Sequence, residues 1–64
     1  MNTSLLELFH LSGKKNYEFH FKIVEDSDNL ITLDNENKII TATIGNPDDE
    51  NLPILIEDVK KQLQ

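Results

Sequence analysis

An alternation of apolar and polar side chains between residues 17 and 23 constrains the fold more than any other feature of this sequence. The segment reads YEFHFKI, with an aromatic or aliphatic residue at every odd-numbered position. A period of two is typical of a β-strand that buries one face and exposes the other. A strand needs partners for its backbone groups, so the chain must be built around a sheet. The odd-numbered side chains are expected to face its core.

Helical periodicity predicts one helix on either side of the strands. Ser4 and Glu7 form the capping-box pattern that begins a helix, and Gly13 is suited to end it. Asn51 is the expected N-cap of the second helix. The apolar stripe of that helix consists of Leu52, Leu55, Ile56, Val59 and Leu63.

Two further strands are predicted at 30–34 (LITLD) and 38–44 (KIITATI), with a two-residue turn at Glu36–Asn37 between them. The register that keeps the apolar side chains on one face pairs Ile23 with Ile31, Phe21 with Leu33, Leu33 with Ile40, and Ile31 with Ala42. The prediction is one small α+β domain over residues 1–64. Its order is α-β-β-β-α, with a three-stranded antiparallel meander and both helices packed on one face.

The composition is that of a small acidic protein from a reducing compartment. The chain has 64 residues and no cysteine, so disulfides and thiolate zinc sites are excluded and a cytoplasmic location is expected. The N-terminal segment lacks the positive flank of a signal peptide, and no apolar run reaches the ~20 residues that cross a bilayer. A net charge of −6 disfavours direct contact with nucleic acid or an anionic membrane. A basic protein is the favoured partner.

The negative charge is concentrated in the middle of the chain. Residues 1–25 and 51–64 are each neutral, so residues 26–50 carry the whole charge of −6. In an up-down-up meander, the first turn and the exit of the third strand lie at the same end of the sheet, about 10 Å apart. Five candidate partner-binding carboxylates gather there: Asp26, Asp28, Asp48, Asp49 and Glu50. The alternative is a solvated surface, in which the dipole of the second helix stabilises the acids before it.

No residue pattern indicates catalysis, a cofactor or a metal centre. The segment DSDNLITL begins with the aspartate spacing of an EF-hand loop, but Leu30 and Ile31 fall where an oxygen ligand and the glycine are needed. His20 is expected opposite Asp34 on the outer face, as a surface charge pair. The sequence has no glycine-rich phosphate loop and no serine in a nucleophile-like turn. We therefore expect no enzyme activity.

The order and length of the elements resemble those of a double-stranded-RNA-binding domain. That family binds phosphates through a lysine cluster at the start of its second helix, and here those positions read Asp48, Asp49 and Glu50. The departure reverses the required charge, so the resemblance does not carry RNA binding with it. In size, element order and charge, the chain is also similar to small acidic phage-encoded inhibitors, including some anti-CRISPR proteins. That similarity implies imitation of a phosphate backbone.

These features predict a small non-enzymatic interaction protein. It would act as an inhibitor or adaptor that docks its acidic end onto a basic, nucleic-acid-binding protein, as a DNA mimic of phage or mobile-element type. One alternative is a self-associating structural or regulatory domain, for instance a homodimer, that uses the unpaired edges of the flanking strands. A second is a divalent-metal-binding module with a loose site shared by residues 26–28 and 48–50.

Overall fold

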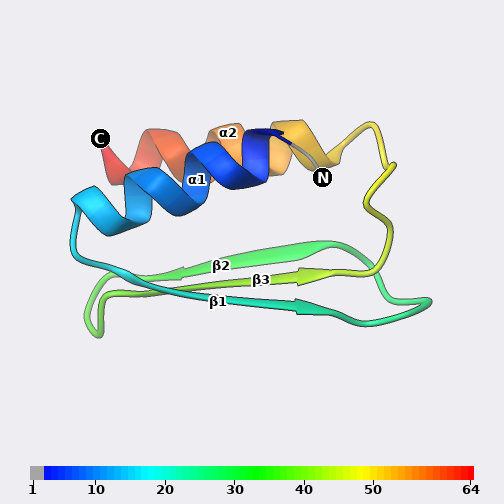
Figure 1. Cartoon of the computed structure of the whole chain (residues 1–64), viewed down its shortest axis with the longest axis horizontal. Helices are drawn as coiled ribbons and strands as arrows, with labels where there is room; N and C mark the ends of the chain where they lie inside the picture. Colours follow the sequence, from blue (N-terminus) through cyan, green and yellow to red (C-terminus); the bar gives the residue numbers. More distant parts are fainter. Residues whose placement is uncertain (1–2) are drawn as a thin grey trace.

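Two helices lie side by side across one face of a three-stranded sheet (Figure 1). The computed structural model describes residues 3–64. The elements are α1 (Thr3–Lys14), β1 (Glu18–Ile23), β2 (Leu30–Asp34), β3 (Ile39–Ile44) and α2 (Leu52–Leu63). The predicted α+β class, the order of elements and the packing of both helices on one face are confirmed. Neither helix in this part of the chain is long and apolar enough to span a membrane.

β3 is the central strand, although it comes last of the three in the chain. The strand order is β1-β3-β2, with β1 parallel and β2 antiparallel to β3. The predicted antiparallel meander is therefore wrong for β1: Phe21 pairs with Ala42, and Ile23 pairs with Ile44. The physical reason lies in β3, whose inward side chains are apolar throughout. The central place, flanked on both sides and covered by the helices, buries all three of them: Ile40, Ala42 and Ile44.

The predicted register between β2 and β3 is confirmed. Leu33 lies opposite Ile40, and Ile31 lies opposite Ala42. The connection is a four-residue loop over 35–38, however, instead of the two-residue turn predicted at Glu36–Asn37. The ladder thus ends one pair earlier than predicted.

The side chain of Asp34 organises this loop. Its Oδ1 accepts hydrogen bonds from the backbone amides of Glu36 and Asn37, both at 3.1 Å. Its Oδ2 accepts a third bond from Asn37 Nδ2 at 2.9 Å. These bonds, above all the one from the Asn37 side chain, hold the pKa of Asp34 below its ordinary value of 3.8. The carboxylate is therefore part of the turn.

The loop over residues 24–29 crosses the end of β3 to reach the far edge of the sheet. It has to do so because β1 and β2 are both edge strands, two interstrand spacings or about 10 Å apart. Gly45, the first residue after β3, lies against this loop. A Cβ at that position would collide with the backbone carbonyl of Ser27. Glycine is required here because two backbone segments approach each other closely. Its backbone conformation is not the reason, because its φ is not positive.

The core lies between the helices and β3. It consists of Leu5, Leu8, Ile40, Ile44, Leu52, Ile56, Val59 and Leu63. The predicted stripe of α2 is confirmed, with Leu55 half-buried beside it. The expected burial of the alternating segment holds only in part: Tyr17 and Phe19 pack partly buried against the core. Phe21 and Ile23 share the inner face of the sheet but are 44% and 72% exposed. An edge strand has a neighbour on one side only, so it lacks half of the shielding that β3 receives.

Both ends of α1 differ from the prediction. The helix already includes Thr3, so Ser4 lies inside its first turn, and it continues past Gly13 to Lys14. The left-handed residue is Asn16, with a φ of 63°. Its amide donates to the carbonyl of Gly13, and the amide of Tyr17 donates to the carbonyl of Ser12. This is the Schellman pattern of a helix end, with asparagine in the place that glycine usually takes.

One cation links the two helices at the surface. Lys60 Nζ of α2 lies 3.2 Å from Glu57 Oε1 and 3.4 Å from Glu7 Oε1 of α1. The hydrogen bond with Glu57 is the main cause of the raised pKa of Lys60. Both carboxylates are exposed, so the bridge helps to orient the helices and contributes little to stability.

Replacing Gly45 with alanine tests the crossing loop. The added methyl group has no room against Ser27, so we expect Gly45→Ala to lower the free energy of unfolding by about 1–3 kcal/mol. Gly13→Ala is the matched control, because nothing lies within 4 Å of a Cβ there and the position is helical. It should be neutral or stabilise by up to ~1 kcal/mol. Urea denaturation measures both values. Equal stability of the two variants would contradict the close passage of the 24–29 loop over Gly45.

The pKa of Asp34 predicts a loss of stability in acid. A carboxylate whose pKa is lowered by folding stabilises the fold above the ordinary value of 3.8, and this contribution is lost as the pH falls through the lowered value. Asp34→Asn keeps the shape without the charge. It should melt below the parent at neutral pH and together with the parent well below pH 3.8. Thermal melting followed by circular dichroism at both pH values tests this, with exposed Asp58→Asn as the control. A difference in melting temperature between parent and variant that persists in acid would exclude the charge as its cause.

Candidate interaction surface

The two acidic loops lie at the same end of the sheet. β1 and β3 run toward this end and β2 runs away from it, so the loops over 24–29 and 45–51 both lie there (Figure 1). The structure places all five candidate residues in these loops. Asp49 is half-buried, and the other four are exposed: Asp26, Asp28, Asp48 and Glu50. We refer to the surface formed by these five residues as the acidic end.

Asn29 joins the two loops. Its Oδ1 accepts hydrogen bonds from the amides of Gly45 and Asn46, both at 2.9 Å. Its Nδ2 donates to the carbonyl of Asn46 at 2.6 Å. A single side chain thus satisfies three backbone groups of the neighbouring loop. The acidic end is therefore one connected surface, with its two halves held in a fixed relation.

Asp49 has a structural role at the start of α2. Its Oδ1 accepts a hydrogen bond from the amide of Asn51 at 3.0 Å, and its carbonyl accepts one from the amide of Leu52. Asn51 occupies the predicted N-cap position, but its side chain makes no capping bond. Asp49 therefore helps to fix the start of α2. In the described part of the chain, the side chains of Asp48 and Glu50 make no hydrogen bond or ion pair.

The acidic end has no internal cation. The ion pairs among residues 3–64 involve Glu7, Glu18 and Glu57, which all lie on other elements. Within the same residues, no group of three or more acidic or histidine side chains is arranged to hold a metal ion. The carboxylates spread over a surface instead of converging on one point. The divalent-metal alternative therefore gains no support from the geometry.

The expected pairing of His20 with Asp34 is wrong. β1 and β2 are not neighbours, and His20 lies opposite Thr41 of β3. The His20 Nε2 atom lies 3.1 Å from Glu18 Oε2 on its own strand. Asp34 is held in the loop after β2 by Asn37. The structure therefore does not bring the two side chains together as a pair.

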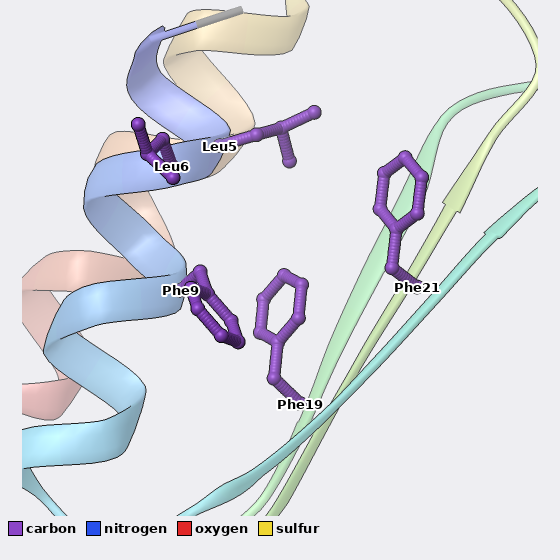
Figure 2. A pocket seen from close by; sticks show the side chains of 5 residues that line it. All are labelled: Leu5, Leu6, Phe9, Phe19 and Phe21. Atoms are coloured by element: carbon purple, nitrogen blue, oxygen red, sulfur yellow. The ribbon is translucent and has the colours of Figure 1, made fainter. Parts of the chain in front are cut away.

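Sequence reasoning missed an apolar groove between α1 and β1. Leu5, Leu6, Phe9, Phe19 and Phe21 surround an open space of about 390 Å³ (Figure 2). The rings of Phe9 and Phe19 meet edge to face, with centroids 5.7 Å apart. The signal for this groove was present in α1, where Leu6 and Phe9 widen the apolar stripe beyond what the core uses. We refer to this feature as the β1 groove.

Comparisons of the chain with protein-family models, with curated proteins and with solved structures gave no significant match. The resemblance to double-stranded-RNA-binding domains therefore stays one of length and element order. The function has to be argued from the surfaces of this chain.

Replacing Asn29 tests whether the two acidic loops are joined. Asn29→Ala removes three hydrogen bonds to the backbone of Gly45 and Asn46, so it should lower the free energy of unfolding by about 1–3 kcal/mol. Asn51→Ala is the matched control, because that side chain makes no capping bond. It should cost less than ~0.5 kcal/mol. Chemical denaturation compares the two, and similar values would mean that Asn29 does not hold the loops.

Proposed function

We propose that this chain is a small non-enzymatic interaction protein that docks its acidic end onto a basic protein, one that itself binds nucleic acid. It acts as an inhibitor or adaptor. In the inhibitor role its carboxylates imitate the phosphates of a nucleic-acid backbone, as phage or mobile-element inhibitors of this type do. The partner's cationic groove supplies the opposite charge.

The observation that supports this proposal most strongly is the gathering of five carboxylates on two loops joined by Asn29. Within residues 3–64, the side chains of four of them make no hydrogen bond or ion pair: Asp26, Asp28, Asp48 and Glu50. Like charges held close together repel, which opposes folding. A cationic partner that covers the loops would relieve this repulsion. Hydrogen bonds and ion pairs of the free chain do not account for these four carboxylates, which supports a role for them in binding.

The dimensions of the acidic end suit electrostatic steering. The loops span about two interstrand spacings, or ~10 Å, and the Debye length at physiological salt is ~8 Å. The five charges therefore act together on an approaching cationic surface. We expect association to be fast at low ionic strength and to slow markedly as salt is added.

Reversing two of the unbonded carboxylates tests the proposal. The parent and Asp48→Lys/Glu50→Lys are immobilised as baits in lysate of the source cells, and Asp49 is kept because α2 uses it. The parent should retain a basic nucleic-acid-binding protein that high salt releases and added DNA displaces. The variant should bind that protein at least ~10-fold more weakly. Its melting temperature should equal or slightly exceed that of the parent, because repulsion is relieved.

Glu36→Lys/Asp58→Lys is the matched control. It changes the net charge by the same amount, but its residues lie on the loop at the other end of the sheet and on α2. It should retain the partner as the parent does. If both double variants lose the partner, net charge alone drives binding. If both keep it, the acidic end is not the docking surface, and either result overturns the proposal.

A further inference from the structure

β1 presents an unpaired backbone edge. Among the described residues, β1 forms a ladder with β3 only. The amide of Glu18 donates to Lys38 O and the amide of Val24 donates to Ile44 O, so even-numbered residues direct their amides toward β3. Successive residues of a strand direct their backbone groups to opposite sides. The amides and carbonyls of Phe19 and Phe21 therefore point to the open edge, where another strand can pair with them.

The β1 groove runs beside this edge. Figure 2 shows side chains of α1 and of β1 facing each other across the groove. Leu6, Phe9 and Phe21 are 47%, 52% and 44% exposed, so their apolar surface is only half covered. A strand added at the edge would bring its own inward side chains to the mouth of the groove. Exposed apolar side chains and unpaired backbone groups thus lie at the same place.

The charges around β1 complement those of a second copy of β1 that runs antiparallel to it and is centred on His20. An antiparallel pair of copies centred there sets Glu18 opposite Lys22 and Phe19 opposite Phe21. Beyond the strands, the antiparallel direction brings the end of one copy that contains Lys14 and Lys15 toward the end of the other copy that contains Glu25 and Asp26. Both the glutamate and the lysine of β1 thus face the opposite charge, and the basic end of each copy lies toward the acidic end of the other. This complementarity identifies the occupant of the edge as a second copy of the chain.

We therefore propose that two copies pair through β1 in the antiparallel register centred on His20, which joins two three-stranded sheets into one six-stranded sheet. Phe19 and Phe21 exchange amide–carbonyl hydrogen bonds with their counterparts across the axis. Glu18 and Lys22 occupy the non-hydrogen-bonded positions, where facing side chains are closest. This proposal is independent of the acidic end and goes beyond the proposed function.

Neighbouring registers are less favourable. A shift by two residues in one direction sets Lys22 opposite His20 and loses the pairing of Lys22 with Glu18. A shift in the other direction leaves Lys22 outside the ladder and shortens it. A shift by one residue would place inner and outer side chains on the same face. The charges and the apolar faces therefore select the same alignment.

The antiparallel direction also keeps the two acidic ends apart. A parallel pair would place ten carboxylates together, because each copy contributes five. In the antiparallel pair, each acidic end lies beside the end of the other copy that contains Lys14, Lys15 and Lys38. The twofold axis is perpendicular to the sheet, so both helical layers lie on one side of it. Leu6 and Phe9 of each α1 then approach those of the other copy and cover the groove.

Charge exchange across the axis tests the register. In analytical ultracentrifugation at physiological salt, the parent should show a concentration-dependent dimer. Glu18→Lys and Lys22→Glu each set like charges opposite each other twice per dimer, so each should raise the dissociation constant by ~10-fold or more. The double variant Glu18→Lys/Lys22→Glu should restore the dissociation constant of the parent. An equimolar mixture of the two single variants should form a heterodimer, because each supplies the charges that the other needs.

Glu36→Lys is the control for Glu18→Lys, because it makes the same change of charge away from β1 and should dimerise as the parent does. A parent that stays monomeric overturns the proposal. So do a dimer that tolerates both single reversals and a mixture that fails to pair. All these variants keep the acidic end intact, so they should still retain the basic partner if the proposed function holds. Failure of one proposal is therefore distinguishable from failure of the other.

Discussion

The burial of β3 is the constraint on which the rest of this structure depends. Its inward residues Ile40, Ala42 and Ile44 are buried because β3 has a neighbour on each side and helices above it. That position forces β1 and β2 to the edges, so the 24–29 loop has to cross the end of β3. The crossing requires glycine at position 45, and the bonds from Asn29 then join this loop to the one after β3. The acidic end is assembled by the same crossing.

Local patterns in the sequence determine the elements of this fold, but not which strands are neighbours. Alternation in β1 and the stripe in α2 each depend on residues close in the chain, so the class, the order and the β2–β3 register could be predicted. Alternation fixes the face on which Phe21 lies and is silent about whether Leu33 or Ala42 lies beside it. Sequential strands are usually neighbours. Here the central position is instead taken by β3, where all its inward apolar side chains are buried.

The location of the acidic end could be predicted in spite of the wrong topology, for a geometric reason. A meander and the observed sheet both have strands that run up, down and up, so either arrangement places the first loop and the exit of β3 at one end. The individual roles could not be predicted. Asp48 and Asp49 are adjacent and chemically identical, yet only Asp49 accepts a bond from the start of α2. That difference arises from loop geometry, as does the contact of Asn29 with a residue 17 positions away.

The open edge of β1 follows from the size of the chain. Two 12-residue helices cover the central strand of the sheet fully and β1 only in part, because a chain of 64 residues has little apolar surface to spare. Pairing of two copies would cover that edge without using the acidic ends, which would point in opposite directions from the joined sheet. A dimer would then present two docking surfaces. Its binding to a partner with repeated basic sites would be strengthened by effective concentration, with no further contact required.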